Sequence, residues 1–403
     1  MNLRQYRILM RAAIALAIAM PAADALAQSR TALRICESKD GAAETRIASC
    51  DTIINDKKAS KANKAAAFLA RGHAYRDGGD AERAIGNYSE ALKLDSKSTD
   101  AYYNRGIAYR DRGDFERATQ DLEQTARLDR RNSVALNAVS HIYYNQRDYE
   151  RAITHLNAAL KLNPNYALAL YNRGMAYRAK GEPDRAIPDF DRAIKLNSTD
   201  AVAYHSRALA YRDIRDYERA IQDFDQAIKI SPNFILALND RGIAYASKGE
   251  IDRAIQDFDQ AILLDPRDAF AYNNRGLAYR SRGETERAIK DYDQAVLLNP
   301  SYVLAYYNRG NAYYDKRQFD QAIQNYDHAV KLDAKYALAY YDRGVAYYEK
   351  RDYERALADL SQAIKLDAKD VLSYYNRGNA YYDKRKFDQA IQNYDHAVKL
   401  DAK

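Results

Sequence analysis

Cysteine and long apolar runs are both scarce in this chain of 403 residues. Cys36 and Cys50 are the only two cysteines, so the chain is neither a disulfide-dense scaffold nor a protein with a paired-cysteine metal site. The apolar stretch near the N-terminus, Ala12–Met20, covers only nine residues, which is too short to cross a bilayer. The sequence therefore offers no membrane span and no cysteine-rich core.

Catalytic motifs are also missing. There is no His-Glu-x-x-His, no Gly-x-Ser-x-Gly and no phosphate-binding loop. The six histidines are scattered along the chain: His73, His141, His155, His205, His328 and His396. We therefore expect no catalytic residues, no metal, no cofactor and no enzymatic activity.

Charge of one sign is not concentrated anywhere in the chain. The formal net charge is +7, from 63 Lys and Arg against 56 Asp and Glu, and the two signs are interspersed. No basic run is typical of a nucleic-acid interface, so a nucleic-acid partner is not expected. A weak, salt-sensitive attraction to anionic surfaces remains compatible with this charge.

What the sequence does contain is a period of 34 residues, repeated ten times from Ala65 to Lys403. One tyrosine marks the period: Tyr75, Tyr109, Tyr143, Tyr177, Tyr211, Tyr245, Tyr279, Tyr313, Tyr347 and Tyr381. An alanine follows each tyrosine by nine residues, from Ala84 to Ala390. Self-similarity of this length indicates stacked supersecondary units, whose extended surfaces usually bind other molecules.

Each unit reads as two amphipathic helices. In the unit Val303–Tyr336, apolar residues recur at helical spacing in both halves, and Asp315-Lys316-Arg317-Gln318 forms the polar break between them. A glycine in the first half, present in eight of the ten units, predicts a close approach of the two helices.

These units resemble the tetratricopeptide repeat. The residues that carry the resemblance are, in one unit, Tyr272, Gly276, Tyr279, Ala288, Tyr292, Ala295 and Pro300. The resemblance implies an all-α fold, a right-handed superhelical solenoid of about ten antiparallel helix pairs over residues 65–403. Two departures are an arginine in place of leucine just before the glycine in nine units, and a closing proline in only four.

The first 64 residues are predicted to be a leader and a cap. Residues 1–27 are typical of a secretory signal peptide, which predicts secretion across the inner membrane into a bacterial periplasm. An uncleaved anchor is the alternative. Residues 28–64 are expected to form an N-terminal cap with a polar connector. In an oxidising compartment Cys36 and Cys50 would form a disulfide, and a redox pair is the rival interpretation.

The arginine before the glycine is usually followed, sixteen residues later, by an aspartate. The pairs are Arg105 with Asp121, Arg173 with Asp189, Arg207 with Asp223, Arg241 with Asp257, Arg275 with Asp291, and Arg343 with Asp359. Asparagine stands there instead after Arg71, Arg309 and Arg377. We interpret these pairs as bridges from the first helix to the second, with a role in ligand binding as the alternative.

The family resemblance also implies that the first helices line a concave ligand groove. On that face we predict a ladder of asparagines at the sixth place of the unit, arginines at the twelfth place in the early units, and tyrosines at the fifth and twelfth places in the late units. The predicted groove residues are Asn104, Asn172, Asn274, Asn308, Asn376, Tyr307, Tyr314, Tyr341, Tyr348, Tyr375, Tyr382, Arg110, Arg178, Arg212 and Arg280. The alternative is that these residues are repeat surface inherited by duplication. His73 and His141 occupy one place on the same face and could join such a site.

The leading hypothesis is a non-enzymatic scaffold that binds a peptide or protein segment in this groove. A glycan-handling or polysaccharide-export scaffold in the bacterial envelope is the second, because tyrosine faces suit sugar rings. The last unit would leave its stacking face bare, which predicts self-association of two chains through that end.

Overall fold

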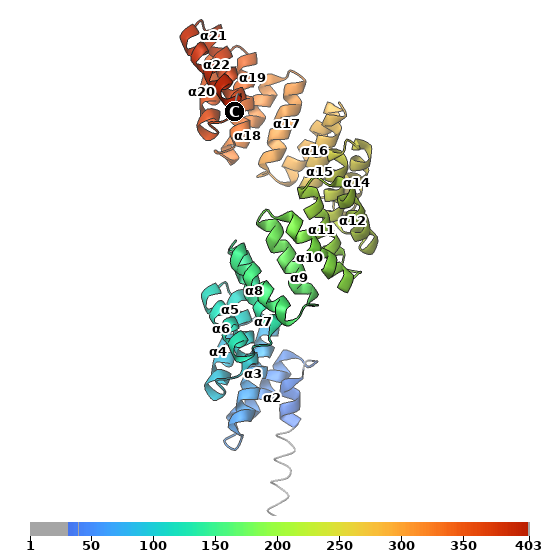
Figure 1. The fold of residues 1–403 in the computed structure, drawn as a ribbon, viewed down its shortest axis with the longest axis vertical. Coiled ribbons are helices and arrows are strands. Elements are labelled where there is room, and N and C mark those ends of the chain that lie inside the picture. Colours follow the sequence, from blue (N-terminus) through green and yellow to red (C-terminus); the bar gives the residue numbers. More distant parts are fainter. Residues whose placement is uncertain (1–30, 39, 402–403) are drawn as a thin grey trace, which may run out of the picture. The chain divides into compact units, whose positions relative to one another are not determined.

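The computed structural model describes residues 31–38 and 40–401 (Figure 1). The predicted signal peptide, residues 1–27, lies outside the described residues. The chain divides into two compact units, Met1–Ser198 and Thr199–Lys403. Each unit is a row of helix pairs, and each is described by itself.

Unit 1 begins with a short helical stretch over residues 31–37 and continues with nine helices. They are α2 (Ala43–Asn55), α3 (Lys61–Asp77), α4 (Ala81–Leu94), α5 (Thr99–Asp111), α6 (Phe115–Leu128), α7 (Ser133–Asn145), α8 (Tyr149–Leu162), α9 (Ala167–Ala179) and α10 (Pro183–Leu196). Helix α3 starts four residues before Ala65, inside the predicted connector, because the Ser60 hydroxyl accepts from the Asn63 amide at 3.0 Å and caps it there.

Unit 2 repeats the same pattern. Its helices are α11 (Ala201–Asp213), α12 (Tyr217–Ile230), α13 (Ile235–Ser247), α14 (Ile251–Leu264), α15 (Ala269–Ser281), α16 (Thr285–Leu298), α17 (Val303–Asp315), α18 (Phe319–Leu332), α19 (Ala337–Glu349), α20 (Tyr353–Leu366), α21 (Val371–Asp383) and α22 (Phe387–Asp401). From α3 on, odd-numbered helices are the first helix of a repeat and even-numbered helices are the second. The described residues contain no strand, so the predicted all-α class of paired helices is confirmed. Within the same residues, none of the helices combines the length and apolarity that a membrane crossing needs.

The second helix of each repeat buries one apolar stripe. In α18 the stripe is Ala322, Ile323, Tyr326, Ala329 and Val330, at the spacing that places side chains on one helical face. Burial of each large member contributes about 1.5–3 kcal/mol, whereas the alanines allow the helices to come close. The stripe therefore accounts for the fixed alanine of the repeat.

The glycine of the first helix faces an aromatic or leucine side chain of the second. A Cβ atom built on Gly310 would lie 2.6 Å from Cε1 of Tyr326, a distance that real Cβ contacts do not reach. The predicted close approach of the two helices is confirmed, and the ring of the partner residue sets it. In the fifth repeat, Ala208 stands at the glycine position and Phe224 beneath it is still fully buried, so the neighbouring ring can adjust.

The turn inside each repeat contains one residue with positive φ. Five of these residues are glycines, with φ between 81° and 87°. The other five are arginines with φ between 57° and 62°: Arg147, Arg215, Arg317, Arg351 and Arg385. In the first repeat, as an example of the pattern, Asp80 N donates to Tyr75 O at 2.8 Å and Gly79 N to Arg76 O at 2.9 Å, which satisfies carbonyls at the helix end. Side chains disfavour this conformation, so the arginine turns are strained.

We expect Arg351→Gly to stabilise the protein by about 0.5–1 kcal/mol, because glycine reaches positive φ without the Cβ clash. Gly113→Ala is the matched reverse change, since Gly113 occupies the same turn place with φ 83°, and it should destabilise the protein by about 1 kcal/mol. Thermal denaturation followed by circular dichroism measures both. A lower melting temperature for Arg351→Gly would contradict the strain.

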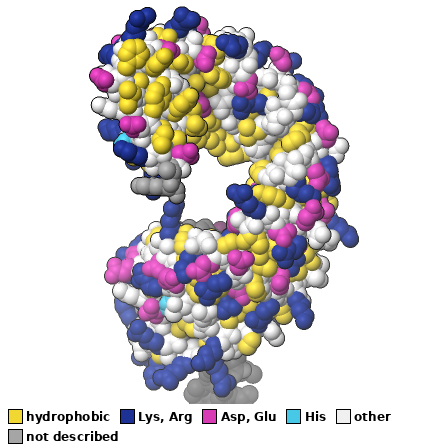
Figure 2. Space-filling view, turned by 45° about the horizontal axis from the view of Figure 1, so that its top comes forward, with side chains coloured by type: hydrophobic (Ala, Val, Ile, Leu, Met, Phe, Trp, Pro, Cys, Tyr) yellow, Lys and Arg dark blue, Asp and Glu magenta, His cyan; other side chains and the backbone are white. Residues whose placement is uncertain are grey.

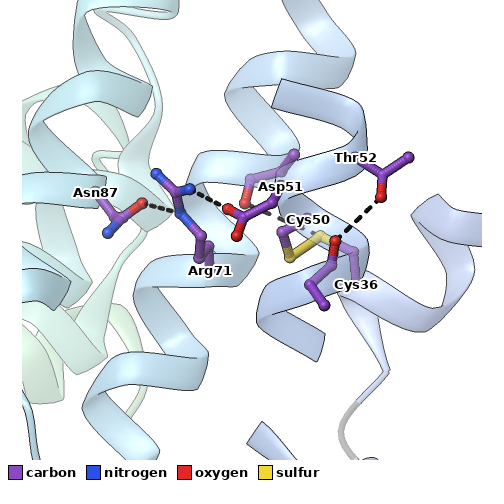
Figure 3. The surroundings of a disulfide bond; sticks show 8 residues. Cys36, Cys50, Asp51, Thr52, Arg71 and Asn87 are labelled. Atoms are coloured by element: carbon purple, nitrogen blue, oxygen red, sulfur yellow. Dashed lines mark hydrogen bonds and ion pairs between the residues drawn. A yellow bond between two sulfur atoms is a disulfide. The ribbon is translucent and has the colours of Figure 1, made fainter. Parts of the chain in front are cut away.

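A disulfide joins the two elements before the first repeat. Cys36, in the stretch 31–37, is bonded to Cys50 of α2, and both are fully buried against Ala67 and Ala70 of α3 (Figure 3). Arg71 of α3 connects this region to the first repeat: it forms an ion pair with Asp51 and donates to Asn87 Oδ1 at 2.7 Å. The cap is thus tied to the repeats by both apolar and polar contacts.

Candidate functional site

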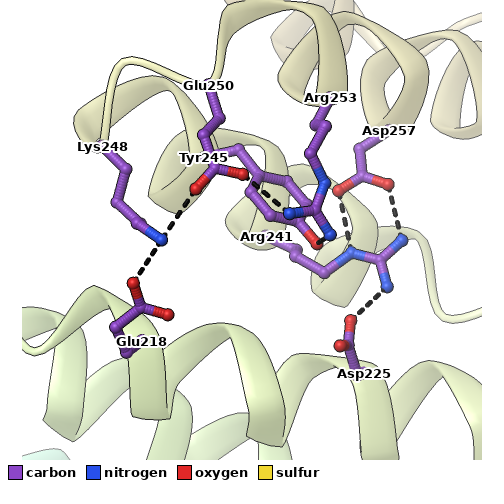
Figure 4. A network of polar contacts seen from close by, with 8 residues as sticks. All are labelled: Glu218, Asp225, Arg241, Tyr245, Lys248, Glu250, Arg253 and Asp257. Carbon is purple, nitrogen blue, oxygen red and sulfur yellow. Dashed lines mark hydrogen bonds and ion pairs between the residues drawn. The ribbon is translucent and has the colours of Figure 1, made fainter.

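The arginine before the glycine bridges the two helices of its own repeat. Arg241 Nε and Nη2 donate to the two carboxylate oxygens of Asp257 at 2.8 and 2.6 Å (Figure 4). The same two-bond contact occurs in all six predicted Arg–Asp pairs. Where asparagine replaces aspartate, as in Arg309–Asn325, the arginine Nε donates to the amide oxygen at 2.7 Å. The predicted bridge is confirmed.

The same guanidinium also reaches the preceding repeat, which the sequence did not predict. Arg241 Nη1 donates to Asp225 of α12 at 2.6 Å, and Arg343 Nη1 donates in the same way to Asp327 of α18 at 2.7 Å. Because these arginines are about four-fifths buried and hold three helices together, their role is structural rather than ligand binding.

The surface predicted to bind a ligand is built from the first helices. We call the side chains at the fifth, sixth, ninth, twelfth and thirteenth places of each 34-residue unit the first-helix face. On this face the fifth place of one repeat bonds to the sixth place of the next. Asn172 Nδ2 donates to Asn137 Oδ1 at 2.9 Å, and Asn308 Nδ2 donates to Asn273 Oδ1 at 2.9 Å.

The predicted asparagine ladder is therefore occupied in part by contacts between repeats. Asn376 Nδ2 donates to Tyr341 OH at 3.0 Å, and Asn104 Oδ1 accepts from Arg76 Nη1 at 2.5 Å. Asn274 accepts from its neighbour Asn273 at 3.3 Å. Each amide retains further donor or acceptor capacity, so a hydrogen bond to a ligand stays a prediction. The contacts seen in this structure mainly join one repeat to the next.

Several side chains at the twelfth place also donate to an aspartate of the next repeat. Arg280 Nε donates to Asp315 at 2.6 Å, Tyr348 OH donates to Asp383 at 2.7 Å, and Arg212 Nη1 donates to Asp240 at 2.5 Å. Arg110 instead donates to the adjacent Asp111 at 2.9 and 2.7 Å, and Arg178 lies half-buried at the same place of α9.

The late tyrosines of the predicted site divide into packed and exposed rings. Tyr307 packs against Tyr326 and Tyr336, with ring centroids 6.0 and 5.1 Å apart. Tyr375 and Tyr382 are exposed over 52% and 57% of their surface, so they are the predicted tyrosines most open to a partner. Figure 2 shows hydrophobic side chains, a class that includes tyrosine, gathered at the top of its view.

Two pockets in unit 1 open between neighbouring first helices. One, of about 190 Å³, is lined by Ser140, His141, Tyr144, Leu156, Tyr171, Asn172 and Met175. The other, of about 670 Å³, lies between the cap, α3 and α5, and its lining includes Arg46, His73, Arg76, Asp100 and Asn104. His73 and His141 thus line separate pockets, and they do not form one site.

Burial changes the titration of both pocket histidines. Desolvation lowers the pKa of His73, with Arg76 contributing in the same direction, and desolvation followed by Arg110 lowers the pKa of His141. A pKa lowered from 6.5 leaves both imidazoles mainly neutral at pH 7, with one donor and one acceptor nitrogen each. His141 Nδ1 lies 3.3 Å from Asn145 Nδ2, and His73 Nε2 is buried without a hydrogen-bond partner among the described residues.

The sequence reasoning overlooked two acidic residues on the first-helix face, Asp240 and Asp342. Each stands at the sixth place, where most repeats have asparagine or a small residue. Asp240 Oδ2 lies 2.8 Å from His205 Nε2, and Tyr307 OH donates to Asp342 Oδ2 at 2.7 Å. A comparison of the sixth place along the ten units could have revealed them.

Comparison with known proteins identifies the repeat. The family profile described as TPR repeat matches residues 72–110, 242–279, 276–317, 310–351 and 346–384. Profiles described as Tetratricopeptide repeat match residues 99–131, 140–201, 201–234 and 371–403. Together these matches include parts of all ten units. No curated protein matches the chain.

Solved structures that are similar to this chain have low sequence identity to it. The APC/C hetero-tetramer Cut9-Hcn1 is 15% identical, with a TM-score of 0.51 over 84% of this chain and 80% of that one. PilF of Pseudomonas aeruginosa is 21% identical (TM-score 0.46, 55% of this chain and 98% of that one), and MamA is 28% identical (TM-score 0.38, 40% and 95%). Only the first of these reaches a TM-score that supports a shared fold, and none transfers a ligand.

Tetratricopeptide repeats form scaffolds for protein–protein interaction, and such scaffolds are typically non-catalytic. The helix pairs, the glycine contact and the profile matches agree with one another along the repeats. The chain belongs to the tetratricopeptide repeat family.

Proposed function

We propose that this protein holds an extended segment of a partner protein along its first-helix face. The observation that carries the proposal is that both pockets between neighbouring first helices combine apolar walls with polar side chains from successive repeats. An extended segment presents a side chain and backbone polar groups at regular intervals, which such a surface can contact in series.

The exposed rings of the last repeat support the same proposal. Tyr375 and Tyr382 of α21 supply amphipathic contact area with few rotatable bonds, so ordering them on binding costs little entropy. By contrast, the second helices expose single apolar side chains of another kind, of which Leu263 and Leu297 are the most exposed at 72% and 70%.

Site-specific photocrosslinking in the native host tests this function. A photoreactive phenylalanine analogue in place of Tyr375 or Tyr382 should form a covalent adduct with a partner protein, because both positions face the proposed segment. The same analogue in place of Leu297, which is 70% exposed, is the control and should give no specific adduct. Adducts from Leu297 alone would place the interface on the second helices, and adducts with glycan would favour the envelope-polysaccharide hypothesis.

We further propose that the protein acts in the periplasm, as the sequence of residues 1–27 predicts. The buried Cys36–Cys50 pair supports this proposal, because disulfides persist in oxidising compartments. Mass spectrometry of unreduced periplasmic protein should find a chain that starts near Gln28 and has no free thiol. Two free thiols in that sample would contradict it.

A further inference from the structure

Two repeats place a carboxylate on the first-helix face at the same position. Asp240 in α13 and Asp342 in α19 are the only aspartates at the sixth place of the ten units. Each meets a residue of the preceding first helix at the fifth place: His205 for Asp240, at 2.8 Å, and Tyr307 for Asp342, at 2.7 Å. The two environments are thus equivalent on this side.

The two sites differ in whether an arginine forms an ion pair with the aspartate. Asp240 Oδ1 accepts from Arg212 Nη1 at 2.5 Å, and Arg212 stands 28 residues earlier in the chain. The residue 28 positions before Asp342 is Tyr314, which has no charge. Among the residues that the structure describes, neither lysine nor arginine forms an ion pair with Asp342. Arg280 influences Asp342 electrostatically, but its guanidinium is held by two bonds to Asp315.

The pKa values of the two carboxyl groups shift in opposite directions. Burial raises the pKa of Asp342, and the pKa of the cation-paired Asp240 is lowered despite similar burial. A half-buried carboxylate gains from a cation more than an exposed one does, because little water is available to solvate it. The difference between the two sites therefore favours an external cation at Asp342.

One tyrosine contacts this carboxylate, and two more lie on the same helices, α17 and α19. Tyr307 donates to it directly. Tyr314 packs with Tyr307 against one apolar cluster, and Tyr341 directly precedes Asp342 in α19. Burial and then the Asp342 charge raise the pKa of Tyr341 to about 12, and burial, Glu349 and Asp342 raise the pKa of Tyr314. Faces of tyrosine rings attract cations, and they stack well on a planar guanidinium.

We propose that Asp342, with Tyr307, Tyr314 and Tyr341, binds an arginine or lysine side chain of the partner segment. The guest cation takes the role at Asp342 that Arg212 has at Asp240. This inference rests on the proposed binding of a protein segment, and it adds that the segment is cationic where it passes α17 and α19.

Substitutions taken from the paired repeat test the idea. Tyr314→Arg supplies the internal cation that Arg212 provides at the equivalent place, so it should occupy Asp342 and exclude the guest. Asp342→Asn removes the charge at nearly constant shape. Gln324→Arg adds the same charge on the exposed surface of the second helix α18 and serves as the charge control. Circular dichroism of all three variants checks that they are folded.

The probe is an acetylated nine-residue peptide of glycine and serine with one central arginine. Its control carries citrulline, which has the same shape without the charge. By isothermal titration we expect the arginine peptide to bind the unmodified protein roughly tenfold more tightly than the citrulline peptide. The ratio should fall to about one for Tyr314→Arg and Asp342→Asn, and it should persist for Gln324→Arg.

Three results would overturn the inference. They are equal affinity of the two peptides for the unmodified protein, a preference for arginine that survives in Tyr314→Arg, and no binding of either peptide at millimolar concentration. None of the three decides the proposed function, which the crosslinks at Tyr375 and Tyr382 test independently.

Discussion

Asp257→Ala is expected to destabilise the protein by about 3–5 kcal/mol, because it leaves the mostly buried Arg241 guanidinium without its principal partner. In the native structure Arg241 makes two bonds to Asp257 and one to Asp225, and thereby joins α12, α13 and α14. The alanine variant removes the bonds inside the repeat and leaves the guanidinium with only the partially exposed Asp225. Urea unfolding followed by circular dichroism measures the loss.

Asp257→Asn is the matched control. Asparagine stands at this place in three native repeats, and there the arginine Nε still donates to the amide oxygen at 2.7–2.8 Å. We therefore expect Asp257→Asn to cost only about 1 kcal/mol. Equal losses for the alanine and asparagine variants would show that the bond to Asp257 does not stabilise the repeat.

Pro188→Ala is expected to stabilise the protein by about 1–3 kcal/mol, since an internal proline costs a helix roughly 3 kcal/mol relative to alanine. Pro188 does not break its helix: α10 runs through it over 14 residues, the same length as α8. The backbone of Pro188 nevertheless cannot donate to the carbonyl of Asp184. Because Pro188 is exposed, the alanine variant removes no core packing.

Pro183→Ala provides the comparison for this gain. Pro183 is the first residue of the same helix, where its missing N–H costs nothing and its φ suits the helix. Pro183→Ala should therefore change the melting temperature little, whereas Pro188→Ala should raise it. A lower melting temperature for Pro188→Ala would show that the ring at this position stabilises the native helix.

Much of the fold could be predicted from the sequence because the period repeats the same information ten times. The spacing of Tyr326 and Ala329 identifies a buried face, and the sixteen-residue offset between Arg241 and Asp257 identifies the bridge, since both lie within a single unit. The positive φ at Arg351 could not be predicted from the residue at that place. Five units have glycine there, which suits positive φ, but five have arginine, a residue that does not indicate this conformation.

The candidate site was less predictable because its contacts connect different units. Asn308 is bonded to Asn273 and Asn376 to Tyr341, and these pairings depend on how one first helix stacks on the next. The repeat period shows which residues share a helix face, but it does not show which of these residues hydrogen-bond to one another. The lack of an ion-pair partner at Asp342 likewise stands out only against the pairing of Asp240 with Arg212.

The polar contacts between repeats join residues at characteristic sequence separations. Arg241 meets Asp225 sixteen residues earlier, Lys248 meets Glu218 thirty residues earlier, and Tyr307 meets Asp342 thirty-five residues later. Each offset is set by the 34-residue unit rather than by one location in the chain, and residues 306–335 recur almost unchanged as residues 374–403. A gene segment that encodes whole units can therefore be gained or lost by recombination while most new junctions keep matching side chains for these contacts. Array length can consequently evolve faster than the chemistry of the individual unit.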